Sequence, residues 1–252
     1  MAIRLKTAEE LSIMREAGAI LSQVFSQLAT HVHPGVKPLE LDRIARESIE
    51  AAGAKPAQLG YQGFPATLCV SRDEIVVHGI PDSRPLRAGE IVSLDCSLFY
   101  QGYLADMART YPVGEIAPEA QRLLAVTREA FFKGFEQIRP EARLGDVSAA
   151  VQRYVESNGF WVVREFVGHG VGLGLHEDPQ VPNFGKPGTG LKLKAGMTLA
   201  LEPMVTLFPA SVITLKDGWT ASAGKGNLAA HYENTVAVTE SGAILLTGAG
   251  GA

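Results

Sequence analysis

The sequence predicts a mixed α/β (α+β) fold built from two similar halves, each with two helices followed by strands. Two observations lead to this prediction: the order of helical and strand-like segments repeats, and short landmarks recur at a nearly constant offset. The paired landmarks are Pro34 with Pro140, Gly53 with Gly159, and Arg87-Ala88-Gly89 with Lys194-Ala195-Gly196. The alternative, that this weak internal likeness arose by chance, stays open on these residues alone.

The helices and strands of each half follow from periodicity and capping signals. In the first half, residues 7–29 carry an apolar stripe behind a Thr7–Glu10 capping box, and a second helix is predicted from Pro38 to Ala52. The strand-like segments that follow are Thr67 to Ser71, Ile75 to Val77, Ile91 to Leu98 and Tyr103 to Val113. The second half repeats this order with helices from near Pro118 and from about Asp146 to Asn158, then strands around Trp161 to Val167, Met197 to Leu201 and Tyr232 to Val238. Because no Pro- or Ser-rich linker separates the halves, we expect one domain over residues 1–252, with pseudo-repeats at about 7–113 and 117–240.

Composition and charge exclude several classes of protein. Of the 252 residues, 46% are hydrophobic and 20% are charged, which is typical of globular proteins. The formal net charge of -4 provides no basic field, so we expect no specific nucleic-acid partner. We expect no membrane span, because no apolar run approaches roughly 18 residues. We expect no secretory signal, because Met1 to Lys6 is followed by acidic and amphipathic sequence rather than by an apolar h-region. The two cysteines, Cys69 and Cys96, have no CxxC spacing, so we expect reduced thiols and a cytoplasmic location.

Asp95 and Asp106 are unusual residues for the strands that hold them. The two strands flank Tyr100-Gln101-Gly102, which predicts a hairpin turn, so the aspartates should lie near each other across the ladder. Strand interiors disfavour Asp, and like charges repel, unless a cation lies between them. For this pair alone, the simpler interpretation is that both side chains face solvent or cap turns.

Glu202 and Glu233 repeat this pattern in the second half, where Glu202 follows an apolar run and Glu233 precedes one. Each glutamate alone is typical of a surface charge at a strand end. The pseudosymmetry, however, pairs Asp95 with Glu202 and Asp106 with Glu233. Four converging carboxylates require cations, because burial of an unpaired charge is prohibitive.

A glycine-rich segment, Phe166 to Pro179, supplies His169 and His176, and a third histidine, His78, precedes Gly79-Ile80-Pro81. The alternate glycines exclude an ordinary helix and allow close approach of the backbone to another element. A lone histidine is most often structural, whereas a cluster of three favours a site. One imidazole with several carboxylates suits manganese, iron(II), cobalt or zinc, and two bridged ions would activate a water. The residues by themselves therefore predict a dinuclear hydrolase.

These segments resemble the type I methionine aminopeptidases, metallopeptidases of the pita-bread fold, over nearly the whole chain. The resemblance rests on the two aspartates eleven apart and on Gly60-Tyr61-Gln62-Gly63-Phe64-Pro65, Val77-His78-Gly79-Ile80-Pro81, Gly168-His169-Gly170-Val171-Gly172, His176-Glu177-Asp178-Pro179, Leu201-Glu202-Pro203 and His231-Tyr232-Glu233-Asn234. It implies a single catalytic domain in which two pseudo-symmetric helix–helix–strand halves surround a central antiparallel sheet. It also implies hydrolysis of the initiator methionine of nascent polypeptides, with a preference for a small second residue.

The resemblance further implies a role for individual residues. Two divalent metal ions (cobalt, manganese, iron or zinc) would be held by Asp95, Asp106, His169, Glu202 and Glu233, with Asp106 and Glu233 bridging. Glu202 would be the general base for the metal-bridged water, and His78 and His176 would contact the substrate amide and the developing oxyanion. The wall of the methionine pocket would consist of Tyr61, Phe64, Cys69 and Trp219. The implied partners are nascent N-termini, with room for a transient ribosome contact, and we expect a monomer.

Three positions depart from the family pattern: Leu175 where an aromatic residue is common, Phe64 where Tyr is frequent, and Gln58 where Cys often occurs. These departures affect the shape of the pocket. The nearest alternative is another exopeptidase of the same fold, such as a proline-specific one. The short interval from His176 to Glu202, without the long insertion of type II enzymes, and the expected lack of a large N-terminal domain like that of Xaa-Pro peptidases favour type I. An inactive peptide-binding module would lack a ligand position, and a metal-buffering protein would not need His78 and His176 outside the ligand set.

Overall fold

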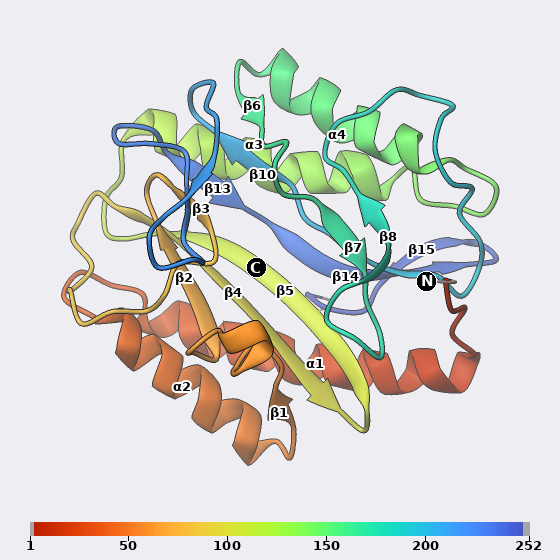
Figure 1. Ribbon diagram of the computed structural model, residues 1–252, viewed down its shortest axis with the longest axis horizontal. Helices are drawn as coiled ribbons and strands as arrows, with labels where there is room; N and C mark the ends of the chain where they lie inside the picture. Colours follow the sequence, from red (N-terminus) through yellow and green to blue (C-terminus); the bar gives the residue numbers. More distant parts are fainter. Residues whose placement is uncertain (1–2, 249–252) are drawn as a thin grey trace.

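The computed structural model describes residues 3–248, in which helices cover one face of a curved antiparallel sheet (Figure 1). The helices are α1 (Ala8–His31), α2 (Pro38–Ala51), α3 (Pro118–Phe135) and α4 (Leu144–Ser157), with a 3₁₀ turn η1 (Tyr61–Gly63). In Figure 1, α1 and α2 lie together at one edge of the view and α3 and α4 at the opposite edge, with the strands between them. The predicted mixed α/β fold with an antiparallel sheet is confirmed. No helix within residues 3–248 is long and apolar enough to cross a membrane.

The strands form one large sheet and two small ones. Their bounds are β1 (Lys55–Pro56), β2 (Leu68–Arg72), β3 (Ile75–Val77), β4 (Ile91–Tyr100), β5 (Tyr103–Pro112), β6 (Trp161–Val162), β7 (Gly168–Gly170), β8 (Glu177–Val181), β9 (Thr198–Leu201), β10 (Met204–Thr206), β11 (Ile213–Thr214), β12 (Ala221–Ser222), β13 (Ala229–His231), β14 (Glu233–Thr239) and β15 (Gly242–Leu245). The large sheet has the order β1-β4-β5-β14-β9-β7-β8, with β2 beside β4 and β15 beside β14. Strand β14 thus lies between the β4–β5 hairpin of the first half and β9 of the second.

Burial of apolar faces holds the helices on the sheet. The predicted capping box begins α1: the Thr7 hydroxyl accepts from the Glu10 N–H, and the Glu10 carboxylate accepts from the Thr7 N–H. Leu21 and Phe25 of α1 then pack with Leu94 of β4 in a buried cluster. Each such side chain contributes roughly 2 kcal/mol relative to an exposed one. A second cluster packs Phe131 of α3 against β9 and β14, so each pair of helices has its own core.

Two of the differences from the sequence prediction concern the segment from Trp161 to Val181. The predicted strand from Trp161 to Val167 is wrong beyond Val162: β10 pairs with Trp161 and Val162, and its last backbone contact on this side is the Val163 N–H, which donates to the Met204 carbonyl oxygen. The glycine-rich segment, by contrast, forms β7 and β8, which periodicity did not predict. These strands pack closely because Gly168 and Gly170 lack side chains: a Cβ on them would lie 2.4 Å from the Ala200 carbonyl oxygen and 2.2 Å from that of Asp178.

Candidate metal centre

The five predicted metal ligands lie on, or directly after, five neighbouring strands of the large sheet. Their order across the sheet is Asp95 on β4, Asp106 on β5, Glu233 on β14, Glu202 directly after β9, and His169 on β7. Strand register determines whether their side chains share a face, because successive side chains along a strand alternate between the two faces.

The register places all five side chains on one face. Asp95 and Glu233 each pair with Ala108, and Asp106 lies two residues from Ala108. Paired residues, and residues two apart, project from the same face of a sheet. The same rule places Glu202 and His169 on this face. Leu201 pairs with Asn234, so the next residue, Glu202, lies opposite Glu233. His169 pairs with Ala200, which is two residues from Glu202. Asp95 and Asp106 are therefore diagonal neighbours rather than directly opposed, two residues out of register.

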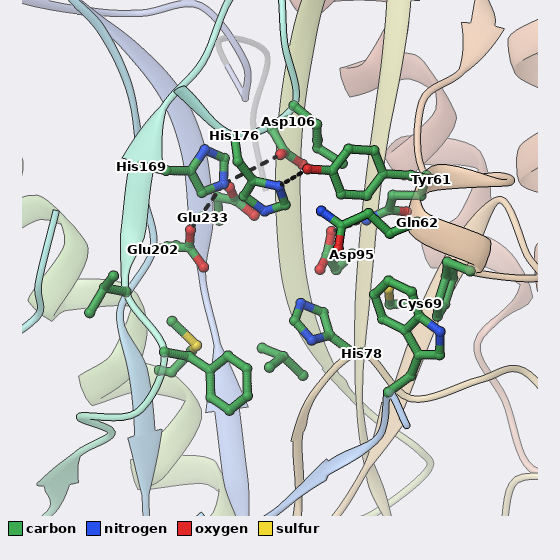
Figure 2. Close-up of a pocket in the computed structure, with 18 residues that line it drawn as sticks. Tyr61, Gln62, Cys69, His78, Asp95, Asp106, His169, His176, Glu202 and Glu233 are labelled. Atoms are coloured by element: carbon green, nitrogen blue, oxygen red, sulfur yellow. Dashed lines mark hydrogen bonds and ion pairs between the residues drawn. The ribbon is translucent and has the colours of Figure 1, made fainter. Parts of the chain in front are cut away.

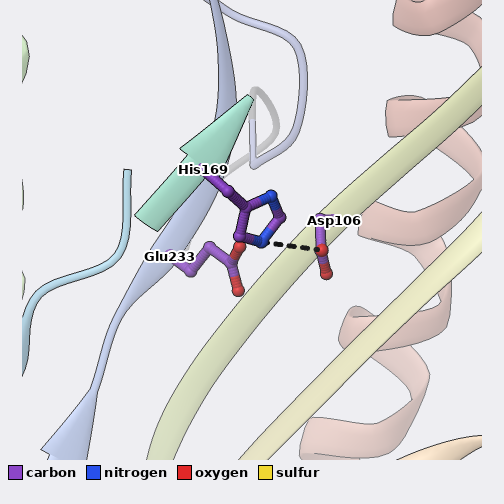
Figure 3. A group of neighbouring side chains, drawn as sticks. All are labelled: Asp106, His169 and Glu233. Carbon is purple, nitrogen blue, oxygen red and sulfur yellow. Dashed lines mark ion pairs between the residues drawn. The ribbon is translucent and has the colours of Figure 1, made fainter. Parts of the chain in front are cut away.

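The five side chains meet in a cavity of about 230 Å³ between the two halves (Figure 2). The same cavity is lined by the predicted catalytic and substrate-binding residues Tyr61, Phe64, Cys69, His78, His176 and Trp219. At its base, His169 Nε2 lies 3.4 Å from Glu202 Oε1 and 4.0 Å from Asp106 Oδ2. Ligand atoms of Asp106, His169 and Glu233 all lie within 4.8 Å of one another (Figure 3). The structure thus brings every predicted site residue to one place.

His169 has the tautomer and the charge state that a metal ligand requires. Its Nδ1 lies 2.9 Å from the Gly170 carbonyl oxygen, so Nδ1–H donates there and the Nε2 lone pair faces the carboxylates. Burial, with a smaller contribution from the adjacent His176, lowers the pKa of His169 to about 3, so the ring is neutral at neutral pH. A neutral imidazole with its second nitrogen already bonded is the usual state of a ligating histidine.

Burial destabilises the charged form of the four carboxylates. Loss of solvation is the largest cause that raises the pKa of Asp106, Glu202 and Glu233 well above the ordinary range, and the neighbouring carboxylates raise it further. Burial also raises the pKa of Asp95, against the opposing effects of His231 and of a hydrogen bond from Gln58. A divalent cation removes both the desolvation cost and the mutual repulsion. The donor set of carboxylate oxygens and one imidazole is therefore suited to a divalent metal ion.

Metal binding is expected to release protons and to stabilise the fold more at higher pH. Because the carboxylate pKa values are raised, the metal-free fold holds more protons than the unfolded chain. Its stability therefore falls as pH rises from the ordinary carboxylate pKa towards the raised values, and a bound ion replaces those protons. Calorimetry with Mn(II) in two buffers of different ionisation enthalpy counts the protons, and melts at about pH 5.5 and about pH 7.5 compare the stabilisation. No proton release, together with a pH-independent rise in Tm, would contradict this expectation.

An apolar recess adjoins the carboxylates. Phe64 and Cys69 are buried in one cluster, which Trp219 partly covers, and the rings of Phe64 and Trp219 meet edge to face with centroids 5.1 Å apart. Burial raises the pKa of the Cys69 thiol well above its usual value, with a smaller effect from Asp95. The thiol is therefore protonated, and it contributes polarisable apolar surface rather than a nucleophile.

His78 and His176 both line the cavity and lie outside the set of five predicted ligands. His78 has a φ of +59°, a conformation that is strained for a non-glycine residue and that occurs most often at functional sites. Burial lowers the pKa of His78 to about 4, so it is neutral. His176 is exposed at the cavity, and its Nδ1 lies 2.9 Å from the Tyr61 hydroxyl. When that hydroxyl donates to Nδ1, the proton sits on Nε2, which is free to donate to a substrate.

Two supporting contacts were not predicted. Gln58, noted above only as a departure from the family pattern, donates from Nε2 to Asp95 Oδ1 at 2.8 Å. Lys6, which is 6% exposed, donates to Glu177 at 2.8 Å, and Glu177 in turn accepts from the backbone N–H groups of Leu173 and Gly174. This ion pair holds the turn that carries His176. Sequence spacing contains no signal for it, because the N-terminal segment reaches the turn only in the folded chain.

Comparison with known proteins identifies the family. Residues 12–240 match the sequence model of metallopeptidase family M24. The chain belongs to this family. It is 51% identical to the methionine aminopeptidase of Clostridium perfringens over 245 residues, which cover 97% of this chain and 98% of that protein. It is 49% identical to methionine aminopeptidase 1 of Bacillus subtilis over 242 residues, which cover 96% and 98%.

Solved structures agree with this assignment to family M24. The chain superimposes on the crystal structure of methionine aminopeptidase from Thermotoga maritima with a TM-score of 0.96 and 44% identity, covering 98% of this chain and 99% of that one. The predicted pita-bread fold and the resemblance to methionine aminopeptidases are thereby confirmed, as is the predicted enzyme class, a methionyl aminopeptidase among the hydrolases. Membership of a metallopeptidase family also agrees with the buried carboxylate–imidazole cluster.

Proposed function

We propose that this M24 chain removes the initiator methionine from nascent polypeptides in the cytoplasm, with a preference for a small second residue. The observation that carries the proposal is a single cavity that combines a buried metal-binding cluster with an apolar recess of Phe64, Cys69 and Trp219. A flexible thioether suits such a polarisable recess, and the adjacent carboxylates attract the free α-amine of a substrate. The methionine aminopeptidases among its relatives support the same activity.

We further propose that two divalent ions, of cobalt, manganese, iron or zinc, occupy the cluster. Their ligands would be Asp95, Asp106, His169, Glu202 and Glu233, with Asp106 and Glu233 bridging. The order of the strands supports the bridging role, because Asp106 and Glu233 lie on the central strands β5 and β14. When bound, the ions supply Lewis acidity, which lowers the pKa of a water molecule and polarises the scissile carbonyl.

The chain's own residues position the substrate and move protons. Glu202 is the proposed general base: it takes a proton from the attacking water and delivers it to the leaving amine. The burial that raises the pKa of Glu202 also makes its carboxylate a better proton acceptor. His176 donates from Nε2 to the oxygen on which negative charge develops, and His78 contacts the peptide amide.

The organisation of the chain remains a proposal as well. We propose a single catalytic domain over residues 1–252, with pseudo-repeats at about 7–113 and 117–240. In support, Gly53 after α2 and Gly159 after α4 share a left-handed conformation, with φ of 72° and 80°. We also propose a monomer that acts on nascent N-termini, contacts the ribosome transiently, and binds neither a specific nucleic acid nor a membrane.

A comparison of four peptides tests the substrate assignment. Met-Ala-Ser is expected to be cleaved on the order of 100-fold faster, in kcat/KM, than Met-Arg-Ser or Leu-Ala-Ser. Chelator treatment should abolish this cleavage, and Mn(II) or Co(II) should restore it. Equal rates on Met-Ala-Ser and Met-Arg-Ser would contradict the small-residue preference, and rapid cleavage of Leu-Ala-Ser would contradict the methionine pocket. Preferred cleavage of Ala-Pro-Ser would instead support the proline-specific alternative.

A further inference from the structure

His231 is a buried imidazole beside the metal cluster, outside the proposed ligand set. It lies at the end of β13, two residues before Glu233, and is 2% exposed. Its Nε2 is 3.4 Å from Glu202 Oε2 and 3.8 Å from Glu233 Oε2. Among residues 3–248, neither of its ring nitrogens has a hydrogen-bond partner. A buried polar ring without a partner in its own fold requires an explanation.

Two hydrogen bonds to the main chain of His231 fix the position of this residue. The Thr110 hydroxyl accepts from the His231 N–H at 2.8 Å and donates to the His231 carbonyl oxygen at 2.9 Å. Thr110 belongs to β5, so this double contact fixes the end of β13 against the strand that carries Asp106. Behind the ring lies a groove of about 680 Å³ between α1 and α3, which His231 also lines. The His231 ring therefore lies between that groove and the carboxylates.

Glu202 lies between two imidazoles, one at each oxygen. Oε1 faces Nε2 of His169 and Oε2 faces Nε2 of His231, both at 3.4 Å. The two rings differ at their other nitrogen: His169 Nδ1 is bonded to the Gly170 carbonyl, whereas His231 Nδ1 has no acceptor among the described residues. Ligating histidines almost always have such an acceptor. This difference favours a ligand role for His169 and a donor role for His231.

We infer that His231 is a positioning residue for Glu202: its Nε2–H faces Oε2 at 3.4 Å without a hydrogen bond in this structure, and it would donate to Oε2 when the ligands hold an ion, which keeps Oε1 turned towards His169. The inference rests on the proposed metal site. A carboxylate without this donor rotates more freely, so it binds the ion less tightly and is less well aimed as a base. Partners that orient ligating carboxylates in this way typically contribute about 10–100-fold in metal affinity or activity.

Two substitutions separate this role from simple packing. In His231→Gln the amide nitrogen replaces Nε2, whereas in His231→Asn it reaches only the position of Nδ1. His231→Gln is expected to keep Mn(II) affinity and kcat within about 3-fold of the parent. His231→Asn should weaken Mn(II) affinity by about 10–100-fold and lower kcat at saturating Mn(II), with KM changed only a few-fold. His33→Asn, which removes an exposed histidine after α1, is the matched control and should match the parent in both.

The readouts distinguish a positioning role of His231 from a ligand role and from a packing role, and loss of Mn(II) affinity in both variants with unchanged Co(II) spectra would also overturn the inference, because Gln should supply the donor. Mn(II) affinity is measured by calorimetry, and the visible absorption of the Co(II)-loaded protein reports its ligands without turnover. Rescue by Gln but not by Asn, with an unchanged Co(II) spectrum in His231→Gln, supports a positioning donor. A changed Co(II) spectrum in both variants would make His231 a ligand and overturn the inference. Parent-like affinity and kcat in His231→Asn, with only Tm lowered, would make it a packing residue. Failure of the metal site itself shows separately, as a His169→Ala variant that keeps its metal.

Discussion

Glu202→Gln is expected to lower kcat by about 10³-fold while the protein still folds. Gln has nearly the same shape but cannot accept a proton, so proton transfer to the leaving amine fails. The metal-free variant should be no less stable than the parent, because burial already raises the pKa of Glu202 and a neutral side chain avoids its repulsion with Asp95. Kinetics on Met-Ala-Ser at saturating Mn(II), with metal content from elemental analysis, separates lost chemistry from lost metal.

The control for this variant is Glu240→Gln, which neutralises an exposed glutamate beyond the site and should leave kcat unchanged. Retention of kcat within about 10-fold in Glu202→Gln at full metal occupancy would remove Glu202 as the base. The proton acceptor would then have to be sought among the other carboxylates that line the cavity.

His176→Ala and His169→Ala are expected to fail in different ways, although both histidines come from one glycine-rich segment. His176 contacts Tyr61 rather than the carboxylates, so its variant should keep its metal and KM within a few-fold but lose about 10²–10³-fold in kcat. His169 lies 3.4 Å from Glu202 and points into the cluster, so its variant should lose metal first. Excess Mn(II) should therefore partly restore His169→Ala and leave His176→Ala unchanged.

Metal content, Tm and steady-state kinetics on both variants decide between these roles. If His176 merely packs the turn, its substitution lowers Tm and spares turnover in the folded fraction. A metal-depleted His176→Ala would show that the ligand set is wrong. The rings of the two histidines are only 4.4 Å apart, so the comparison tests function at nearly the same place in the cavity.

The sequence predicted the local parts of the site well. The turn at Tyr100-Gln101-Gly102 brings Asp95 and Asp106 together. The hairpin could be predicted because it is a short-range structure whose turn residues are recognisable in the sequence. The glycines beside His169 likewise predicted a close approach of backbones, which β7 makes to β8 and β9. The predicted strand beyond Val162 failed because an apolar run forms a strand only where a partner strand continues beside it.

The amino-acid sequence by itself determined the helices, the β4–β5 hairpin and the chemical types of the ligands, since these depend on periodicity, turn chemistry and side-chain identity. Only the tertiary structure decided how the ligands are held. Gln58 reaches Asp95 across 37 positions of sequence, and Lys6 reaches Glu177 across 171. The insertion of β14 between β5 and β9 brings Glu233 to both Asp106 and Glu202. Contacts of this kind are set by sheet order and by the packing of distant segments, which leave no periodic trace in the chain.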